Sequence, residues 1–95
     1  MVKQRLPVFW AREAKDQLKA IYSYYKEESP QGATNVRKDI LALVAHIPVF
    51  PKKHQVDPDL GEPYRRAVVR HYHIVYYIRE EGVFIVDIFD ARQSP

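Results

Sequence analysis

Two stretches in the first half of the chain repeat apolar residues at helical spacing. Between residues 11 and 28 these residues follow an i, i+4, i+7, i+8, i+11 stripe, and most charged residues lie off it. A second stripe starts after Ser29-Pro30, a good N-cap followed by a proline suited to the first helical turn, and ends near Ile47, before Pro48. The connection is short, which predicts an antiparallel helical hairpin. The stripe residues are Ala14, Leu18, Ile21, Tyr22 and Tyr25, then Ala33, Val36, Ile40, Leu43, Val44 and Ile47.

The second half of the chain has the pattern of β-strands. The runs YRRAVV (64–69), YHIVYYI (72–78) and VFIVDIF (83–89) are rich in valine, isoleucine and aromatic residues. Short connections between them predict an antiparallel meander. The middle run is apolar on both faces, which is typical of a strand inside a sheet. We expect one face to hold Tyr72, Ile74, Tyr76 and Ile78, and the other Val75 and Tyr77.

Two further segments complete the fold prediction. Residues 3–10, KQRLPVFW, are short and half apolar, and Pro7 lacks the N–H of an inner strand, so we expect an edge strand. Residues 48–63 contain four prolines and a glycine and form a long loop. The predicted order is β-α-α-β-β-β. The fold class is α+β, in which a helical hairpin packs on one face of a small antiparallel sheet, and residues 1–95 form a single domain.

Composition excludes several classes of protein. The chain is 46% hydrophobic and 28% charged with few glycines, so it is globular rather than disordered. It has no cysteine, which excludes disulfides and cysteine-ligated metals. No apolar run approaches the ~18 residues of a membrane span, and the first residues lack the apolar core of a signal peptide. We therefore expect a soluble, cytoplasmic protein without membrane contacts.

The net charge of +3 does not decide the function. Residues 1–51 carry eight Lys/Arg against five Asp/Glu, and residues 52–95 carry seven against seven. A basic domain is compatible with nucleic-acid binding, but a charge of this size is also what solubility requires. His71 and His73 are spaced like metal ligands on a strand, but no third ligand is evident nearby. We expect no metal and no cofactor.

Five motifs, taken in order, resemble one protein family. They are AKDQLKAIYSYY in the first helix, SPxxA at the start of the second, YRRAVV, YHIVYYI, and IVDIFDARQSP at the end. Together they resemble the RelE/ParE superfamily of bacterial toxins from type II toxin–antitoxin systems, over nearly the whole chain. The resemblance implies a small toxin that a co-expressed antitoxin neutralises by wrapping a segment around it. Operator DNA would be bound only through that antitoxin.

The family has two branches with different targets. RelE-like members cut mRNA in the ribosome, and ParE-like members inhibit DNA gyrase. RNA cleavage needs general acid–base groups and fixed cations. The resemblance implies that such groups would be Arg65, His73 and Arg92, while another expected cation falls on Ala67. The tail tyrosine or histidine that commonly completes the RelE-like set has no counterpart after Arg92, where only Gln93, Ser94 and Pro95 follow.

We therefore favour a ParE-like gyrase inhibitor that acts by binding, with no catalytic residue of its own. The alternatives are a RelE-like mRNA endonuclease and a degenerate module that only binds its antitoxin. For each candidate residue a simpler role is also open: Arg92 could pair with Asp90 or Asp87, and the arginines of the first meander strand could be a solvated surface. The expected target-binding residues are Arg65, Arg66, Arg92, Lys52 and Lys53. The expected antitoxin-binding residues are Ile21, Tyr24, Tyr25 and Tyr77.

Overall fold

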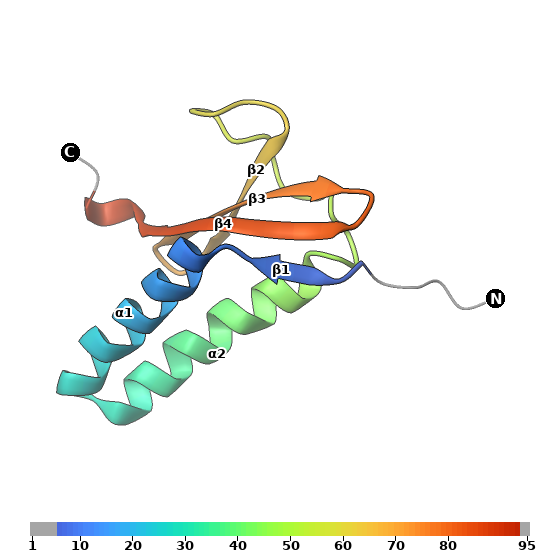
Figure 1. Cartoon of the computed structure of the whole chain (residues 1–95). Coiled ribbons are helices and arrows are strands. Elements are labelled where there is room, and N and C mark those ends of the chain that lie inside the picture. Colours follow the sequence, from blue (N-terminus) through green and yellow to red (C-terminus); the bar gives the residue numbers. More distant parts are fainter. Residues whose placement is uncertain (1–5, 94–95) are drawn as a thin grey trace.

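The computed structural model describes residues 6–93 and shows two helices on one face of a four-stranded sheet (Figure 1). The predicted order of elements and the α+β class are confirmed. A short 3₁₀ turn, η1, follows the last strand. The elements are β1 (Val8–Trp10), α1 (Arg12–Glu28), α2 (Pro30–His46), β2 (Tyr64–Val69), β3 (Tyr72–Arg79), β4 (Gly82–Asp90) and η1 (Ala91–Gln93).

The sheet is mixed, which corrects the prediction of a purely antiparallel sheet. Its strand order is β1-β4-β3-β2, and the meander β2-β3-β4 is antiparallel as expected. The edge strand β1, however, runs parallel to β4. A parallel pair needs a long crossover, and the segment between β1 and β4 contains both helices and two strands. Two backbone bonds fix the pairing: Val83 N–H donates to Pro7 O at 2.9 Å, and Ala11 N–H donates to Ile85 O at 2.8 Å.

The two helices are capped and buried to different degrees. At the start of α2 the Ser29 Oγ accepts a hydrogen bond from Gly32 N–H at 3.0 Å, whereas Ala11 gives α1 no side-chain cap. In α1 only Ala14 is buried. The other stripe residues of α1 therefore remain partly open to solvent. The buried residues of α2 are Ala33, Val36, Ile40 and Val44.

The two faces of β3 are as predicted. Tyr72, Ile74 and Tyr76 are buried in the core beneath the helices, and Tyr77 lies on the face away from them. On that open face one aromatic side chain from each strand stands in register across the whole sheet. Neighbouring ring centroids in this row are 5.0, 5.0 and 5.7 Å apart. The aromatic row consists of Phe9, Phe84, Tyr77 and Tyr64.

A β-bulge interrupts β4. Tyr76 pairs with Ile85 and Val75 pairs with Asp87, so Val86 is the extra residue. The inward alternation of β4 consequently restarts at Ile88, which is buried with Val83 and Ile85. The bulge therefore determines which face the last residues of β4 present.

The long loop before β2 is anchored to the sheet. Asp57, which is 1% exposed, accepts hydrogen bonds from the N–H groups of Asp59 and Leu60, both at 2.9 Å. Its other oxygen accepts from Arg66 Nε at 2.9 Å. Nearer the start of the loop, Pro51 O accepts a hydrogen bond from the Tyr76 hydroxyl at 2.8 Å. The backbone of the loop also pairs with the outer edge of β2, where Asp57 N–H donates to Tyr64 O at 2.8 Å and Arg66 N–H donates to Gln55 O at 3.0 Å. This pairing protects that edge from another chain.

The helices α1 and α2 are the longest apolar-striped segments in the described part of the chain. Neither has the length and the apolar content that a membrane crossing requires.

Candidate functional site

A groove lies where the middle of α1 meets the end of β4 and the turn η1. Its volume is about 380 Å³. Apolar side chains from the helix and the strand form its walls, and Asp90 and Arg92 lie at its polar end. We call it the Arg92 groove; its lining includes Gln17, Ile21, Tyr24, Tyr72, Ile88, Phe89, Asp90 and Arg92.

Arg92 is held in place by the residue two positions before it. Its backbone N–H donates to Asp90 Oδ1 at 2.9 Å, and its Nη2 contacts Asp90 Oδ2 at 3.0 Å. An aspartate that accepts the N–H two residues later is a standard turn-forming arrangement. The Arg92 hydrogen bonds lower the pKa of Asp90, so the carboxylate stays charged and the pair stays closed at neutral pH. The Arg92 side chain remains 62% exposed.

A tyrosine and a histidine from distant segments lie beside this pair. The Tyr25 hydroxyl is 3.2 Å from His71 Nε2, and that nitrogen is 3.8 Å from Asp90 Oδ2. His71 is fixed by Arg70, which adopts a left-handed conformation (φ 54°), and by its own carbonyl, which accepts the Ala91 N–H at 2.9 Å. Arg92 was expected to lack an acid–base neighbour because none follows it in sequence. The fold corrects this expectation: the neighbours come from α1 and from the β2–β3 turn.

The three residues of the RNA-cutting alternative do not form one site. Arg65 is two positions from the buried Ala67 and so lies on the helix-facing side of β2, where its Nη1 donates to His54 O at 2.7 Å. His73 is on the opposite side of the sheet, with its ring 5.2 Å from that of Phe89. A sheet separates these two side chains, so they cannot act on the same phosphate.

The model of the family described as "ParE toxin of type II toxin-antitoxin system, parDE" matches residues 8–95. The chain belongs to the ParE toxin family. A solved structure titled "Chromosomal ParDE TA system from P. aeruginosa" has the same fold, with a TM-score of 0.78 and 19% sequence identity. That match covers 90% of this chain and 96% of the other. A search of the curated proteins gives no match.

The expected toxin component of a type II toxin–antitoxin system is thereby confirmed, and the ParE-like branch with it. A cognate antitoxin is the partner that such a system implies. Among residues 6–93 of this ParE toxin, the histidines and carboxylates form no group of three or more that could hold a metal ion.

The residues expected to bind the antitoxin lie at two separate places in the structure. Ile21 and Tyr24 line the Arg92 groove, and Tyr25 lies next to it through His71. Tyr77 is instead part of the aromatic row on the open face of the sheet. Residues expected to bind the antitoxin and a residue expected to bind the target thus share one groove in this ParE toxin.

The other residues expected to bind the target lie elsewhere. Arg66 is engaged with Asp57 and, at 3.0 Å, with Asp59, so its charge is neutralised. Lys52 and Lys53 are exposed and line a separate hollow beside Val49, Phe50 and Pro51. Arg92 therefore differs from the other candidates in combining an exposed guanidinium with an apolar groove.

Sequence reasoning missed Tyr25–His71–Asp90 and the Arg66–Asp57 pair. Tyr25 and His71 are 46 positions apart, and no local pattern links them. The positions of Asp57 and Arg66 in the sequence also did not predict their contact. The two prolines and the glycine between them let the chain turn back, and no simple periodicity describes such a loop.

Proposed function

We propose that this ParE toxin inhibits DNA gyrase by binding to it in the cytoplasm, and that its cognate antitoxin neutralises it. The observation that favours binding over RNA cleavage is the separation of Arg65 and His73 on opposite faces of the sheet. Cleavage through a charged phosphorane requires several cations around one phosphate. The described site offers Arg92 alone, and Asp90 neutralises it.

The Arg92 groove has the composition of a binding hot spot. Arginine and tyrosine are enriched among the residues that dominate protein interfaces, particularly beside apolar pockets. Here the exposed Arg92 guanidinium stands next to Ile21 and Tyr24. Asp90 fixes the arginine before any partner arrives, which reduces the entropy lost on binding.

The position of Arg92 in this groove also suggests how the antitoxin neutralises the toxin. An antitoxin segment that packs on Ile21 and Tyr24 occupies the groove and covers Arg92. The antitoxin and the target then compete for one surface, so no conformational change of the toxin is required.

The proposal is tested with purified components. The toxin is added to gyrase, relaxed plasmid and ATP, and supercoiling is followed on gels; in parallel it is added to a translation extract, and mRNA ends are mapped. We expect supercoiling to fall with toxin concentration and mRNA to remain intact. Intact supercoiling together with codon-phased mRNA cuts would refute gyrase inhibition.

Arg92→Ala tests the groove in the same supercoiling assay. Removing a hot-spot side chain costs at least 1–2 kcal/mol, so the inhibitory concentration should rise about tenfold. Lys38→Ala, an exposed cation on α2, is the matched control and should leave the inhibitory concentration unchanged. Equal effects of the two substitutions would show that general charge, and not the groove, determines inhibition.

A second candidate function is RNA cleavage by a different set of residues. The observation in its favour is the cluster of Tyr25, His71 and Arg92 around Asp90. This set supplies a proton donor and acceptor but a single neutralised cation. If the translation assay does show mRNA cuts, Arg92→Ala should abolish them while antitoxin binding stays nearly intact. Persistence of the cuts in that variant would exclude this site.

A further inference from the structure

A hollow of about 590 Å³ lies in the loop that follows α2, and it shares no residue with the Arg92 groove. Three apolar residues and two lysines line it: Val49, Phe50, Pro51, Lys52 and Lys53. We call it the Phe50 hollow. Phe50 is 57% exposed, so an aromatic ring is open to a partner beside two cations.

The backbone of the hollow is held in a fixed shape. Lys53 N–H donates to Phe50 O at 3.1 Å and closes the turn that carries the lysines. Within that turn, Pro51 O accepts the bond from the Tyr76 hydroxyl. Tyr76 belongs to β3 and is fully buried, so the core of the sheet anchors the turn. A turn that is already ordered loses less entropy when a ligand binds.

The surroundings of the hollow are positively charged. Residues 40–56 contain no aspartate or glutamate. Arg65 adds a third cation, because its Nη1 donates to His54 O at 2.7 Å. Among the described residues 6–93, Lys52, Lys53 and Arg65 form no ion pair. Burial, and then the charge of Lys53, lower the pKa of His54, so the charge at neutral pH comes from the other three residues and favours an anionic ligand.

The features that stay open favour a nucleic-acid strand over a peptide. Pro48 and Pro51 have no N–H, and Pro51 O is already bonded, so the loop offers little backbone for an added peptide strand. Residues 47–54 contain no helix or strand that could present a long apolar stripe to a partner helix. A ring flanked by cations is instead typical of single-strand sites, where an unpaired base stacks on the ring and phosphates contact the cations.

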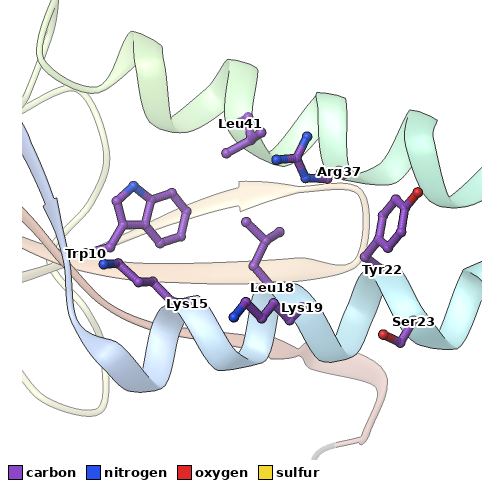
Figure 2. Close-up of a pocket in the computed structure, with 8 residues that line it drawn as sticks. All are labelled: Trp10, Lys15, Leu18, Lys19, Tyr22, Ser23, Arg37 and Leu41. Carbon is purple, nitrogen blue, oxygen red and sulfur yellow. The ribbon is translucent and has the colours of Figure 1, made fainter.

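A second basic surface, the interhelical cleft between α1 and α2, provides a comparison (Figure 2). Its lining includes Lys15 and Lys19. Its aromatic residues, Trp10 and Tyr22, are half-buried, whereas Phe50 is exposed. A base therefore finds a freer ring in the Phe50 hollow than in the interhelical cleft.

We propose that the Phe50 hollow binds single-stranded DNA, with an unpaired base stacked on Phe50 and the neighbouring phosphates on Lys52 and Lys53. The choice of DNA over RNA rests on the proposed function, since gyrase acts on DNA. The ring, the cations and the fixed turn rest on the structure. A toxin bound to gyrase would then contact, through this loop, an unpaired stretch of the enzyme's own substrate.

Fluorescence anisotropy of a labelled oligonucleotide measures this binding with the toxin alone. The probe is a deoxyuridine strand of about ten nucleotides, within the usual footprint of a single-strand site. We expect saturation with a Kd between about 10⁻⁴ and 10⁻⁶ M, and a slope of log K against log salt of about −1.4 to −2, as for two or three phosphates. A duplex of the same length should bind at least about fivefold more weakly, and equal binding would overturn base stacking.

A uridine strand of the same length separates DNA from RNA, because it differs from the probe only in its 2′-hydroxyl groups. It should bind no more tightly than the deoxyuridine strand. Tighter binding of the uridine strand would overturn the assignment to DNA.

Charge reversal and ring substitution locate the site. Lys52→Glu/Lys53→Glu should weaken binding by at least about tenfold. Lys15→Glu/Lys19→Glu makes the same change in net charge in the interhelical cleft and should weaken binding less than about threefold. Phe50→Leu should weaken binding at least about fivefold, whereas Phe50→Trp, which keeps a ring and guards against misfolding, should bind at least as tightly as the parent. Equal weakening by the two glutamate pairs, or unchanged binding by Phe50→Leu, overturns the proposal.

Gyrase provides the second arm. The Lys52→Glu/Lys53→Glu toxin should bind DNA-free gyrase as tightly as the parent but need at least about a tenfold higher concentration to inhibit supercoiling. Weaker binding to DNA-free gyrase would assign the lysines to a protein contact and overturn the proposal, as would inhibition at the parent concentration. If the parent toxin does not inhibit gyrase, the proposed target is wrong, while the oligonucleotide titration still decides whether the hollow binds a single strand.

Discussion

At the scale of single residues, the pairing of Asp57 with Arg66 is the most deeply buried ion pair described above. The side chains are 1% and 12% exposed. Burial alone raises the pKa of Asp57, but the N–H groups of Leu60 and Asp59 and the Arg66 guanidinium outweigh burial and hold that pKa below its ordinary value. Without the Asp57 carboxylate, the largely buried Arg66 guanidinium would keep only the exposed Asp59 as an ionic partner, which is costly.

Asp57→Asn should therefore destabilise the protein by about 3 kcal/mol, since Arg66 would keep its charge in a site shaped for a carboxylate. Urea unfolding followed by circular dichroism measures this loss. The control is Asp16→Asn, on the exposed face of α1, which should change the free energy of unfolding by less than about 0.5 kcal/mol. A similar small change for Asp57→Asn would show that the pair contributes little.

The lowered pKa of Asp57 predicts that the free energy of unfolding depends on pH. The folded-state pKa of Asp57 is lowered, so its contribution is fully present above the unfolded pKa, near 3.8, and is lost as pH falls through and below that value. The urea midpoint should thus fall as pH drops below about 4. In Asp57→Asn this part of the decline should disappear. An identical acid dependence in both proteins would assign the decline to other carboxylates.

Residue identities alone predicted part of the site. Arg92 was singled out by its place at the end of a strand pattern, and Ile21 and Tyr24 by their places on a helix. Asp90 was one of the two partners considered for Arg92, and the structure pairs them. Tyr25 and His71 could not be placed beside that pair, because their proximity depends on how α1 crosses β4 and on the left-handed Arg70. Such contacts are tertiary, and neither periodicity nor propensity encodes them.

At the scale of elements, the edge strand β1 fits closely over the start of β4. A Cβ atom at Gly82 would lie 2.5 Å from Pro7 O and 2.8 Å from the Phe9 ring. Gly82 therefore lets the two backbones approach, and the β1–β4 pairing depends on it.

Gly82→Ala should push β1 away from β4 and cost about 1–3 kcal/mol, the usual range for overpacking. Gly32→Ala is the control, since its Cβ would meet only the Ser29 side chain, at 3.2 Å, within a helix that alanine favours. The thermal unfolding midpoints of both variants measure this cost, and the midpoint of Gly82→Ala should be the lower. A midpoint for Gly82→Ala at or above that of Gly32→Ala would show that β1 can shift without cost.

Elements with a strong local pattern were predicted within a residue or so. Helices were expected over 11–28 and from Pro30 to Ile47, and they span Arg12–Glu28 and Pro30–His46. The meander followed from short connections. The direction of β1 could not be deduced, because its partner lies at the other end of the sequence and three apolar residues fit either direction. The bulge at Val86 likewise gives no signal in a continuous apolar run.

At the scale of the whole molecule, the two helices differ in how many of their residues are buried from solvent. α2 buries four residues, whereas α1 buries Ala14 alone and begins without a side-chain cap. Segments with few buried contacts open locally at low free energy. The Arg92 groove borders on α1, so the surface proposed above for antitoxin binding includes the less protected helix.

Amide hydrogen exchange should therefore be faster in α1 than in α2 or β3 in the free toxin. An antitoxin that packs on Ile21 and Tyr24, as proposed above, should slow exchange in α1 more than in β3 when it binds. Mass spectrometry of peptic fragments from free and bound toxin measures both effects. Exchange in free α1 as slow as in β3 would contradict this ranking.

The parallel contact between β1 and β4 has a consequence for biosynthesis. Val8 pairs with Val83, 75 positions later in the sequence (83 minus 8). Closing so large a loop is slow compared with forming a hairpin. During translation β1 therefore remains without its partner strand until Gly82–Asp90 has left the ribosome. Each newly made toxin molecule thus passes through a stage in which two helices and a hairpin can already form while the edge strand is still unpaired.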